Sequence, residues 1–383
     1  RMSVCFTNEH IYVQFIDDQA GVTLAAASTR SKTIPDRDKL AANVGSAKRV
    51  GTLAAEVARG KGILAIDESQ ATIKKRFDGI GVECTEPNRR AYRDLLITAR
   101  GGAEFISGMI LFDETLRQST AAGMPFPKAL KDQGIMPGIK VDKGAKDLAG
   151  HPGELVTEGL DGLRDRLAEY RGMGAVFAKW RAVITIGTDI PSVTCIETNA
   201  HALARYAALC QAEGIVPIVE PETLMDADNT TETCFAVTER TLHALFAELV
   251  RQQVTLEHTI LKVNMVIAGK KCLQQASVQQ VADLTMRCLL RCVPAAVPGI
   301  VFLSGGQSAQ LATAHLHAMN AAHPKPPWPL SFSYGRALQD PCLKAWGGKP
   351  ENVPAAQKAL LHRERCNSLA CLGQYTEAIE KQA

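Results

Sequence analysis

The sequence lacks the spacing patterns that mark disulfide frameworks and common metal sites. Its 383 residues include eleven cysteines, an odd number, and no two of them form a C-x-x-C pair. Reduced and mostly buried thiols are therefore expected. No H-E-x-x-H motif occurs, and His315, His317 and His323 have no Cys or Glu beside them at ligand spacing. We expect these histidines to lie on a solvated helix face, and we expect no structural metal.

Long apolar runs and a strong net charge are also missing. No apolar run reaches the roughly eighteen residues that a membrane span needs, so no membrane contact is expected. The formal net charge is only +3, which gives no overall argument for nucleic-acid binding. The content of 46% hydrophobic and 22% charged residues is ordinary for a globular protein. The length suits one large α/β barrel with a small appendage, or about two to three average domains.

Eight short apolar runs, each closed by charged or small polar residues, recur from residue 62 onward. Their spacing of roughly 30 to 45 residues leaves room for a helix in every gap. Apolar residues at three- and four-residue spacing fill several gaps, as in residues 86–100, 199–214 and 230–253. We predict a closed (β/α)8 TIM barrel, with an open doubly wound sheet as the alternative because the pattern does not reveal strand order. The runs are GILAIDES from residue 62, SGMILFDE from 107, GIKVDKG from 138, GAVFAKWR from 174, GIVPIVEPE from 214, HTILKVNMV from 258, GIVFLSGGQ from 299 and LSFSYGRAL from 330.

The polar residues that close these runs indicate where the functional site lies. In a (β/α)8 barrel the active site is built at the C-terminal ends of the strands. The residues at those ends are unusually rich in lysine. They are Asp67 and Glu68, Asp113 and Glu114, Lys140, Asp142 and Lys143, Lys179 and Arg181, Glu220 and Glu222, Lys262 and Asn264, Ser304, Gly305 and Gly306, and Ser333, Gly335 and Arg336.

Three of these lysines, Lys140, Lys179 and Lys262, are expected to converge with three carboxylates, Asp67, Glu220 and Glu222. Ionisable groups in a barrel mouth are costly to desolvate unless they pair, so the cluster must be mutually compensated. A lysine crowded by another ammonium and partly desolvated loses its proton near neutral pH, and only the free amine attacks a carbonyl to form an imine. Ordinary structural ion pairing of each lysine is the alternative interpretation.

Two groups of residues at opposite sides of the mouth are predicted to bind phosphate. LSGGQS at 303–308 and SYGR at 333–336 supply backbone N–H groups and Arg336, and the loops after the last two strands of this fold frequently hold a phosphate. Ser69, Thr72, Lys75 and Arg76 follow the first strand, and Lys140 ends the third. The pattern therefore predicts a doubly phosphorylated small molecule that carries a carbonyl group.

Taken together, these motifs resemble class I fructose-1,6-bisphosphate aldolases over roughly residues 60–377. The resemblance rests on GILAIDES, GIKVDKG, FAKWR, VPIVEPE, ILKVNMV, FLSGGQS, FSYGRAL and KAWGGKPENVPAAQKALL. The ISG, ETL and QST segments and the AIDES ending are similar to plant or algal plastid enzymes. The resemblance implies reversible cleavage of fructose 1,6-bisphosphate to dihydroxyacetone phosphate and glyceraldehyde 3-phosphate, no cofactor, and a homotetramer. An aldolase for a monophosphate or for sedoheptulose bisphosphate is an open alternative.

The resemblance also implies a catalytic role for residues at four strand ends. Lys262 would form the imine, and Glu220 would act as acid and base in carbinolamine dehydration, with Glu222 close to Lys262. Asp67 would exchange a proton with the C4 hydroxyl. Lys179 would lower the pKa of Lys262 and stabilise charge.

The same resemblance divides the phosphate-binding residues between the two ends of the substrate. Arg181 would lie beside Lys179. The phosphate on C1 is expected on Ser304, Gly305, Gly335 and Arg336. The other phosphate is expected near Thr72, Arg76 and Lys140, beside the Ser69 that the residue pattern already placed there.

Two positions depart from the family pattern. Val263 stands where the family usually has proline after the imine-forming lysine, which loosens the backbone without removing chemistry. The family ends in a mobile tail with a tyrosine that assists proton exchange at C3, whereas the last tyrosine here is Tyr375. Without such a tyrosine, we expect turnover to fall at enamine protonation while imine formation survives.

The first sixty residues follow a different pattern. Residues 2–32 contain three short runs of alternating apolar and polar residues separated by turn residues, which is typical of a small antiparallel meander. With residues 38–63, this stretch resembles the front half of the bacterial or organellar large-subunit ribosomal protein that binds 5S rRNA. That resemblance implies contact with a ribosome or 5S rRNA through residues 1–60, with basic side chains facing phosphates. These are Arg30, Lys32, Arg37, Lys39, Lys48 and Arg49.

We therefore expect a ribosomal-protein-like meander over residues 1–45, a linking helix over 46–61 that both resemblances share, and a barrel with a C-terminal helical tail over 62–383. Three explanations stay open: a fusion that tethers an aldolase to a ribosome, a fusion with a vestigial or merely structural first piece, and a composite chain. The rival to an enzyme is a ribosomal component that carries the barrel as a passenger. Both resemblances indicate an organelle, with the chloroplast stroma favoured and the mitochondrion or cytosol as alternatives.

Overall fold

The computed structural model describes residues 2–6, 11–17, 22–28, 60–323 and 325–382. The first three ranges form a small antiparallel sheet in which β1 (Met2–Phe6) pairs with β2 (Ile11–Asp17), and β2 pairs with β3 (Val22–Ser28). The three alternating runs thus form the meander predicted from the sequence. The linking helix expected over 46–61 falls almost entirely on residues 46–59, which lie outside the described residues.

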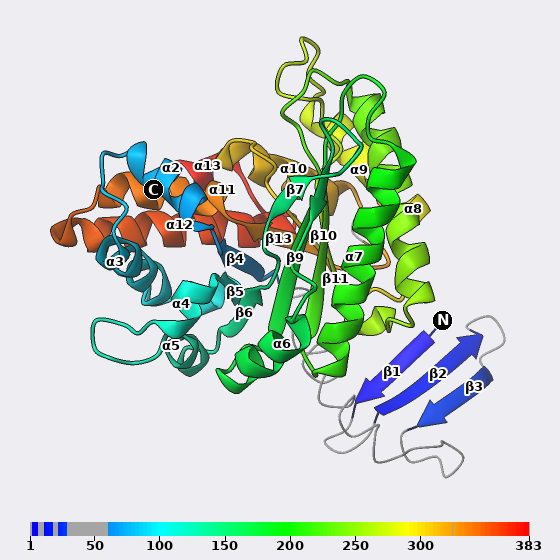
Figure 1. Ribbon diagram of the computed structural model, residues 1–383, viewed down its shortest axis with the longest axis horizontal. Coiled ribbons are helices and arrows are strands. Elements are labelled where there is room, and N and C mark those ends of the chain that lie inside the picture. The colour runs from blue at the N-terminus through cyan, green and yellow to red at the C-terminus, as the bar shows by residue number, and fades with distance from the viewer. Residues whose placement is uncertain (1, 7–10, 18–21, 29–59, 324, 383) are drawn as a thin grey trace.

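Eight parallel strands close into a barrel in which each strand pairs with its neighbours in chain order (Figure 1). The closed order confirms the predicted (β/α)8 barrel over the open sheet, because the last strand pairs with the first. Each predicted apolar run contributes one strand. The strands are β4 (Gly62–Ile66), β5 (Ile106–Leu111), β6 (Met136–Lys140), β9 (Phe177–Ile184), β10 (Val216–Thr223), β11 (Ile260–Val263), β12 (Ile300–Phe302) and β13 (Leu330–Tyr334).

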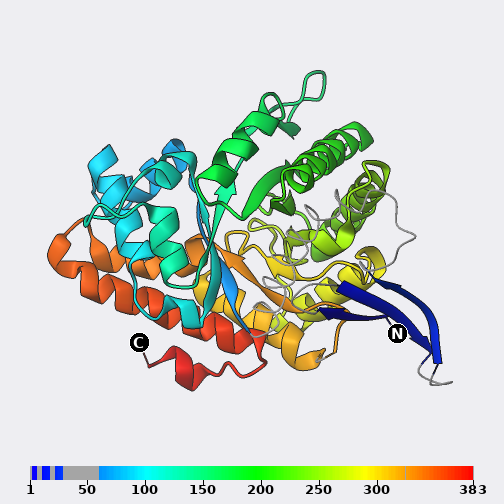
Figure 2. The same ribbon diagram turned by 90° about the horizontal axis from the view of Figure 1, so that it is seen from below.

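Helices surround these strands on the outside of the barrel (Figure 2). The three segments with helical spacing all form helices, and the longest is α8. The helices are α2 (Gln70–Asp78), α3 (Glu86–Ile97), α4 (Asp113–Arg117), α5 (Phe126–Asp132), α6 (Leu163–Gly172), α7 (Val193–Ala212), α8 (Thr231–Arg251), α9 (Val278–Cys292), α10 (Ala309–Ala322), α11 (Arg336–Trp346), α12 (Val353–Cys371) and α13 (Glu377–Glu380), with short 3₁₀ turns η1 (Gly102–Glu104), η2 (Leu256–His258) and η3 (Pro350–Asn352).

Polar side chains define where many of these helices begin. Ser69, Thr85, Ser192, Thr230 and Ser308 each precede a helix and accept a hydrogen bond from the backbone N–H three residues further on. Such caps satisfy N–H groups that have no partner inside the helix and typically contribute about 1 kcal/mol each. Local sequence therefore determines helix starts at the strand-to-helix loops that carry the site.

One hairpin interrupts the alternation of strands and helices. Strands β7 (Ala145–Asp147) and β8 (Leu155–Thr157) pair with each other in antiparallel fashion between β6 and β9. The hairpin was not predicted, because neither three-residue strand is long enough to show an alternating pattern. Its second strand is anchored to the barrel by Thr157, whose hydroxyl donates to the backbone oxygen of Arg181 at 2.8 Å.

The barrel interior below the site is a closed apolar cluster. Its buried members point inward from six strands: Ile63, Ala65, Ile110, Phe177, Val216, Ile218, Ile260 and Val301. The ring of Phe177 fills the centre so tightly that a Cβ on Gly138 would lie 2.1 Å from it. This packed floor closes the barrel, so access to the strand ends comes from the other side.

The cysteines and His315 show how well burial can be read from the sequence. The ten cysteines between residues 84 and 371 are unpaired, and most of them are buried as expected. The expected solvated face was wrong for His315, which is buried with its Nδ1 2.6 Å from Gln307 Oε1. Burial lowers the pKa of His315 to about 4. The helix that carries it, α10, is covered by α9 and α12, so one face of α10 is interior.

Nowhere in the described ranges does a helix combine the length and apolar character that crossing a membrane requires.

Candidate active site

Strand alternation places the charged residues directly above the apolar floor. Side chains two positions apart on a strand point to the same side, so the inward row that includes Ile63 and Ala65 continues to Asp67. The same step leads from Phe177 to Lys179, from Ile218 to Glu220 and from Ile260 to Lys262. On each of these strands, the inward-facing side chains therefore change from apolar to charged in a step of two residues at the C-terminal end of the barrel.

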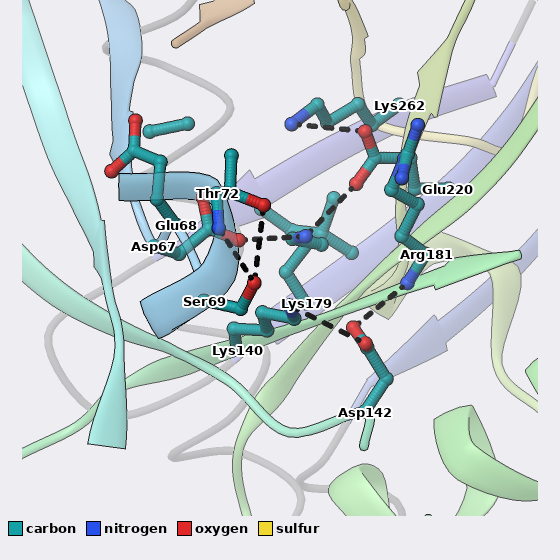
Figure 3. A network of polar contacts seen from close by, with 12 residues as sticks. Asp67, Glu68, Ser69, Thr72, Lys140, Asp142, Lys179, Arg181, Glu220 and Lys262 are labelled. Atoms are coloured by element: carbon teal, nitrogen blue, oxygen red, sulfur yellow. Dashed lines mark hydrogen bonds and ion pairs between the residues drawn. The ribbon is translucent and has the colours of Figure 1, made fainter. Parts of the chain in front are cut away.

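Glu220 bridges the two buried lysines (Figure 3). Its Oε1 lies 3.1 Å from Lys262 Nζ, and its Oε2 lies 3.3 Å from Lys179 Nζ. Lys179 Nζ also contacts Asp67 Oδ2 at 2.7 Å. Only 3% of Lys179, 3% of Glu220 and 4% of Lys262 is exposed, so these charges compensate one another away from water.

The carboxylates of this cluster stay ionised. Burial alone would raise the pKa of Asp67, but the ammonium groups of Lys179, Lys262 and Lys140 together hold that pKa well below its usual range. The pKa of Glu220 is likewise lowered, because Lys262, Lys179 and Arg181 outweigh burial. Burial would lower the pKa of Lys179, yet Asp67, Glu220 and Asp142 raise it above its usual value. Lys179 therefore supplies a lasting positive charge beside Glu220.

Glu222 belongs to a neighbouring pair rather than to the lysine cluster. Its Oε2 forms a close ion pair with Arg181 Nε, one step further along the inward rows of β10 and β9. The expected closeness of Glu222 to Lys262 stays a prediction, and the carboxylate that forms an ion pair with the Lys262 ammonium is Glu220. Lys140 Nζ lies 3.7 Å from Asp142 Oδ1, and Asp142 Oδ2 accepts from the Arg181 backbone N–H at 3.3 Å (Figure 3).

The start of α2 forms one corner of the candidate site, and its groups suit an anion. Ser69 caps the helix, and its hydroxyl lies 3.1 Å from the hydroxyl of Thr72 (Figure 3). The N-terminus of this nine-residue helix presents backbone N–H groups and a positive dipole. Arg76 extends from the next turn, where Glu68 Oε1 contacts its Nη1 at 2.5 Å.

Buried side chains hold Glu68 in place for its ion pair with Arg76. Glu68 Oε2 also contacts Arg93 Nη2 at 2.8 Å, and Gln339 Nε2 donates to Glu68 Oε1 at 2.8 Å. Burial would raise the pKa of Glu68, but Arg76 and Arg93 lower it below its usual value. Arg76 is therefore held rigidly at the edge of the corner.

The loops after β12 and β13 form the opposite corner. Gly305 and Gly306 both have positive φ, +53° and +82°, so side chains are disfavoured there and the backbone is left open. Gly335 precedes α11, whose first residue is Arg336. A Cβ on Gly306 would lie 3.0 Å from Arg336 Nη2, which places the guanidinium beside this loop.

One cavity of about 560 Å³ joins these parts. The catalytic and phosphate-binding residues that the family resemblance implied all line it, as do Ser69, Lys75 and Ser333. The hydroxyl of Ser333 is buried and has no hydrogen-bond partner among the described residues. Sequence reasoning missed Leu224, Met225, Asp226 and Lys270, which also line the cavity from loops beyond the strand ends. Basic side chains outnumber acidic ones in the lining, so the cavity favours negatively charged molecules.

Two groups of side chains elsewhere could offer ligands to a metal ion. They are Glu239, His243 and Cys292 between α8 and α9, and His362, Cys366 and Glu380 between α12 and α13. Neither group lines the cavity, and in the second Glu380 is already ion-paired with Arg363.

A (β/α)8 barrel with two buried lysines bridged by one carboxylate, between two cation-rich corners, defines an enzyme that acts on phosphorylated carbonyl compounds. Residues 50–383 match the family of class I fructose-bisphosphate aldolases. The chain belongs to that family, which confirms the resemblance and the enzyme class predicted from the sequence. Residues 1–69 match a second family, ribosomal protein L18 of archaea, bacteria, mitochondria and chloroplasts, so residues 50–69 are shared by both matches.

Relatives in bacteria, plants and a parasite share most of the chain. A probable fructose-bisphosphate aldolase class 1 of Xanthomonas campestris pv. campestris is 61% identical over 325 residues, which is 85% of this chain and 97% of that protein. Cytosolic fructose-bisphosphate aldolase 4 of Arabidopsis thaliana is 55% identical over 82% of this chain and 80% of its own length. The aldolase of Plasmodium falciparum, solved with TRAP and an inhibitor, superimposes with a TM-score of 0.83 at 48% identity and covers 86% of this chain and 96% of that chain. These bacterial and cytosolic relatives give no support to the expected chloroplast location.

Proposed function

We propose that the protein cleaves fructose 1,6-bisphosphate reversibly to dihydroxyacetone phosphate and glyceraldehyde 3-phosphate through an imine on Lys262. The observation that carries this proposal is the placement of Glu220 between the Lys179 and Lys262 ammonium groups, directly above the barrel floor. A carboxylate 3.1 Å from a buried amine can take the proton that the amine must lose before it attacks a carbonyl.

The first half of the reaction joins substrate to protein. Lys262 Nζ attacks the C2 carbonyl and forms a carbinolamine, whose oxygen leaves as water after receiving a proton from Glu220. The product is a protonated imine. Lys179 keeps its charge beside Glu220 throughout, so it stabilises the ionised carboxylate between proton transfers.

The second half breaks the carbon–carbon bond. Asp67 takes the proton of the C4 hydroxyl, the C3–C4 bond breaks, and its electron pair flows into the imine nitrogen to give an enamine and glyceraldehyde 3-phosphate. Protonation at C3 returns the imine, and water then releases dihydroxyacetone phosphate. The depressed pKa of Asp67 keeps it in the carboxylate form that this step needs.

The two cation-rich corners would hold the two phosphates. Ser304, Gly305, Gly335 and Arg336 are proposed for the phosphate on C1, and Ser69, Thr72, Arg76 and Lys140 for the phosphate on C6. Arg181, paired with Glu222, would orient the substrate between them. Sedoheptulose bisphosphate differs from the proposed substrate by one carbon and fits the same chemistry. A homotetramer remains our expectation from the family.

Borohydride trapping tests the imine directly. The protein is incubated with dihydroxyacetone phosphate, reduced and digested, and the modified peptide is found by mass spectrometry. We expect one adduct, on the peptide that carries Lys262. A folded protein that gives no adduct anywhere would exclude the imine mechanism and favour the passenger interpretation of the barrel.

Contact with 5S rRNA is a second candidate function, favoured by the ribosomal-protein match over residues 1–69. If residues 1–60 bind RNA through phosphates, replacing both Lys48 and Arg49 with alanine should weaken 5S rRNA binding about tenfold. The slope of the logarithm of the binding constant against the logarithm of the salt concentration should become shallower by about two units. Gel-shift titrations of the full chain measure both quantities. Lys74→Ala, an exposed barrel lysine, is the matched control. This function would be contradicted if the unaltered protein, the double variant and Lys74→Ala all bound 5S rRNA with the same affinity, and bound an unrelated folded RNA equally well.

A further inference from the structure

Lys270 lines the candidate active site although it lies outside every strand-end motif. It belongs to the loop between β11 and α9, eight residues after Lys262. Its ammonium contacts Asp226 Oδ1 at 2.7 Å, and both side chains line the cavity. Both are substantially exposed, with 46% and 70% of the side chain accessible, so the pair contributes little to stability and can separate readily.

Backbone contacts hold the Lys270 loop against the loop that follows β10. Gly269 N–H donates to Asn229 O at 2.8 Å, Lys270 N–H to Met225 O at 2.8 Å, and Lys271 N–H to Ala227 O at 3.0 Å. The loops approach so closely that a Cβ on Gly269 would lie 2.2 Å from Ala227 O. The base of the Lys270 side chain is therefore fixed by main-chain hydrogen bonds.

The fixed loop directs Lys270 toward the glycine corner. A Cβ on Gly306 would lie 2.6 Å from Lys270 Nζ and 3.0 Å from Arg336 Nη2. Two cations thus meet beside a loop whose positive φ values leave its backbone open. The two positive charges repel each other, which costs free energy, and a bound dianion between them would remove that repulsion.

We propose that Lys270 is a further substrate-binding residue of the corner formed by Ser304, Gly305 and Arg336, where it binds the substrate phosphate together with Arg336. The proposal rests on the assignment of the C1 phosphate to that corner under the proposed function. Asp226 holds the Lys270 ammonium near Gly306. When phosphate enters, Lys270 exchanges the carboxylate for a phosphate oxygen.

Lys270→Met in the full chain tests the proposal through a comparison of two substrates. Fructose 1,6-bisphosphate and fructose 1-phosphate both carry the C1 phosphate, so KM should rise about tenfold for both, with kcat changed less than about twofold. Added salt should raise the KM of the unaltered protein more than that of the variant. Lys271→Met removes a neighbouring exposed charge that does not line the cavity and should leave both KM values unchanged. Lys270→Arg should recover most of the loss.

Two kinetic outcomes would overturn the proposal. An unchanged KM for both substrates in Lys270→Met would remove Lys270 from phosphate binding. A KM raised for the bisphosphate alone would move Lys270 to the other phosphate.

Calorimetric titration with inorganic phosphate separates this proposal from the proposed function. We expect Lys270→Met to bind phosphate more weakly than the unaltered protein, and equal binding would overturn the proposal. If the unaltered protein binds phosphate through Lys270 but neither cleaves the bisphosphate nor forms a borohydride adduct, the aldolase proposal fails while Lys270 keeps its anion-binding role.

Discussion

Replacing Lys262 with methionine is expected to lower kcat for fructose 1,6-bisphosphate cleavage by about 10⁴-fold or more, because the covalent route through the imine is lost. Methionine keeps the length and apolar stem of lysine, so the packing above Ile260 and Val301 should survive. Glu220 would retain Lys179 as its ionic partner. The measurements are steady-state cleavage and borohydride trapping with dihydroxyacetone phosphate, and the adduct on this peptide should disappear.

Lys74→Met is the control for this experiment. Lys74 is exposed on α2 and paired with Asp78 at 2.8 Å, so its loss removes one lysine without touching the cavity. It should cleave substrate at the rate of the unaltered protein. If Lys262→Met folds normally by circular dichroism and still yields an adduct, another lysine is the nucleophile, and Lys179 is the first to examine.

The barrel and its charged layer were predictable because two simple periodicities govern them. Buried parallel strands leave continuous apolar runs, and the residue that closes each run lies at the functional end of the barrel. That rule alone led to Lys179, Glu220 and Lys262 and to their convergence. It needs no knowledge of loop paths, since strand geometry fixes where these side chains point.

The features that were missed depend on contacts between segments far apart in the sequence. Lys270 reaches the cavity only because its loop is hydrogen-bonded to residues 225–229. The partner of Glu222 is decided by the stagger between β10 and β9, which places Arg181 beside the carboxylates. The burial of His315 depends on the packing of α10 against other helices and on its contact with Gln307. None of these relations leaves a periodic trace in the sequence.

The overlap of the two family matches has a structural consequence for the barrel. Residues 50–69 are common to both, and they include β4 and Asp67. Strand β4 closes the barrel by pairing with both β13 and β5. A segment that ends the ribosomal match thus also supplies the closing strand and one site carboxylate of the aldolase. The two family matches therefore overlap inside the first barrel unit rather than meeting end to end.

Asp67→Asn is expected to separate the two halves of the proposed reaction. Cleavage of fructose 1,6-bisphosphate should fall by about 10²- to 10⁴-fold, because the C4 hydroxyl loses its proton acceptor. Imine formation with dihydroxyacetone phosphate needs no group at C4, so the borohydride adduct should remain. Hydrogen exchange at C3 of dihydroxyacetone phosphate should also remain, because the enamine forms without carbon–carbon cleavage.

A comparison of C3 hydrogen exchange with bisphosphate cleavage in Asp67→Asn distinguishes a proton-accepting role of Asp67 from a positioning role. Asparagine keeps the shape of the side chain but removes the charge that meets Lys179 at 2.7 Å, so exchange and cleavage falling together would assign Asp67 to positioning Lys179. Asp78→Asn, an exposed carboxylate on α2, should change neither reaction.

Because the Lys179, Lys262 and Lys140 charges overcome burial and hold the pKa of Asp67 below its usual range, this carboxylate stays ionised through neutral and mildly acidic pH. Any loss of cleavage activity between pH 7 and pH 5 in the unaltered protein should therefore arise from another group. If hydrogen exchange at C3 is lost over the same pH range, that group acts in the imine half of the reaction.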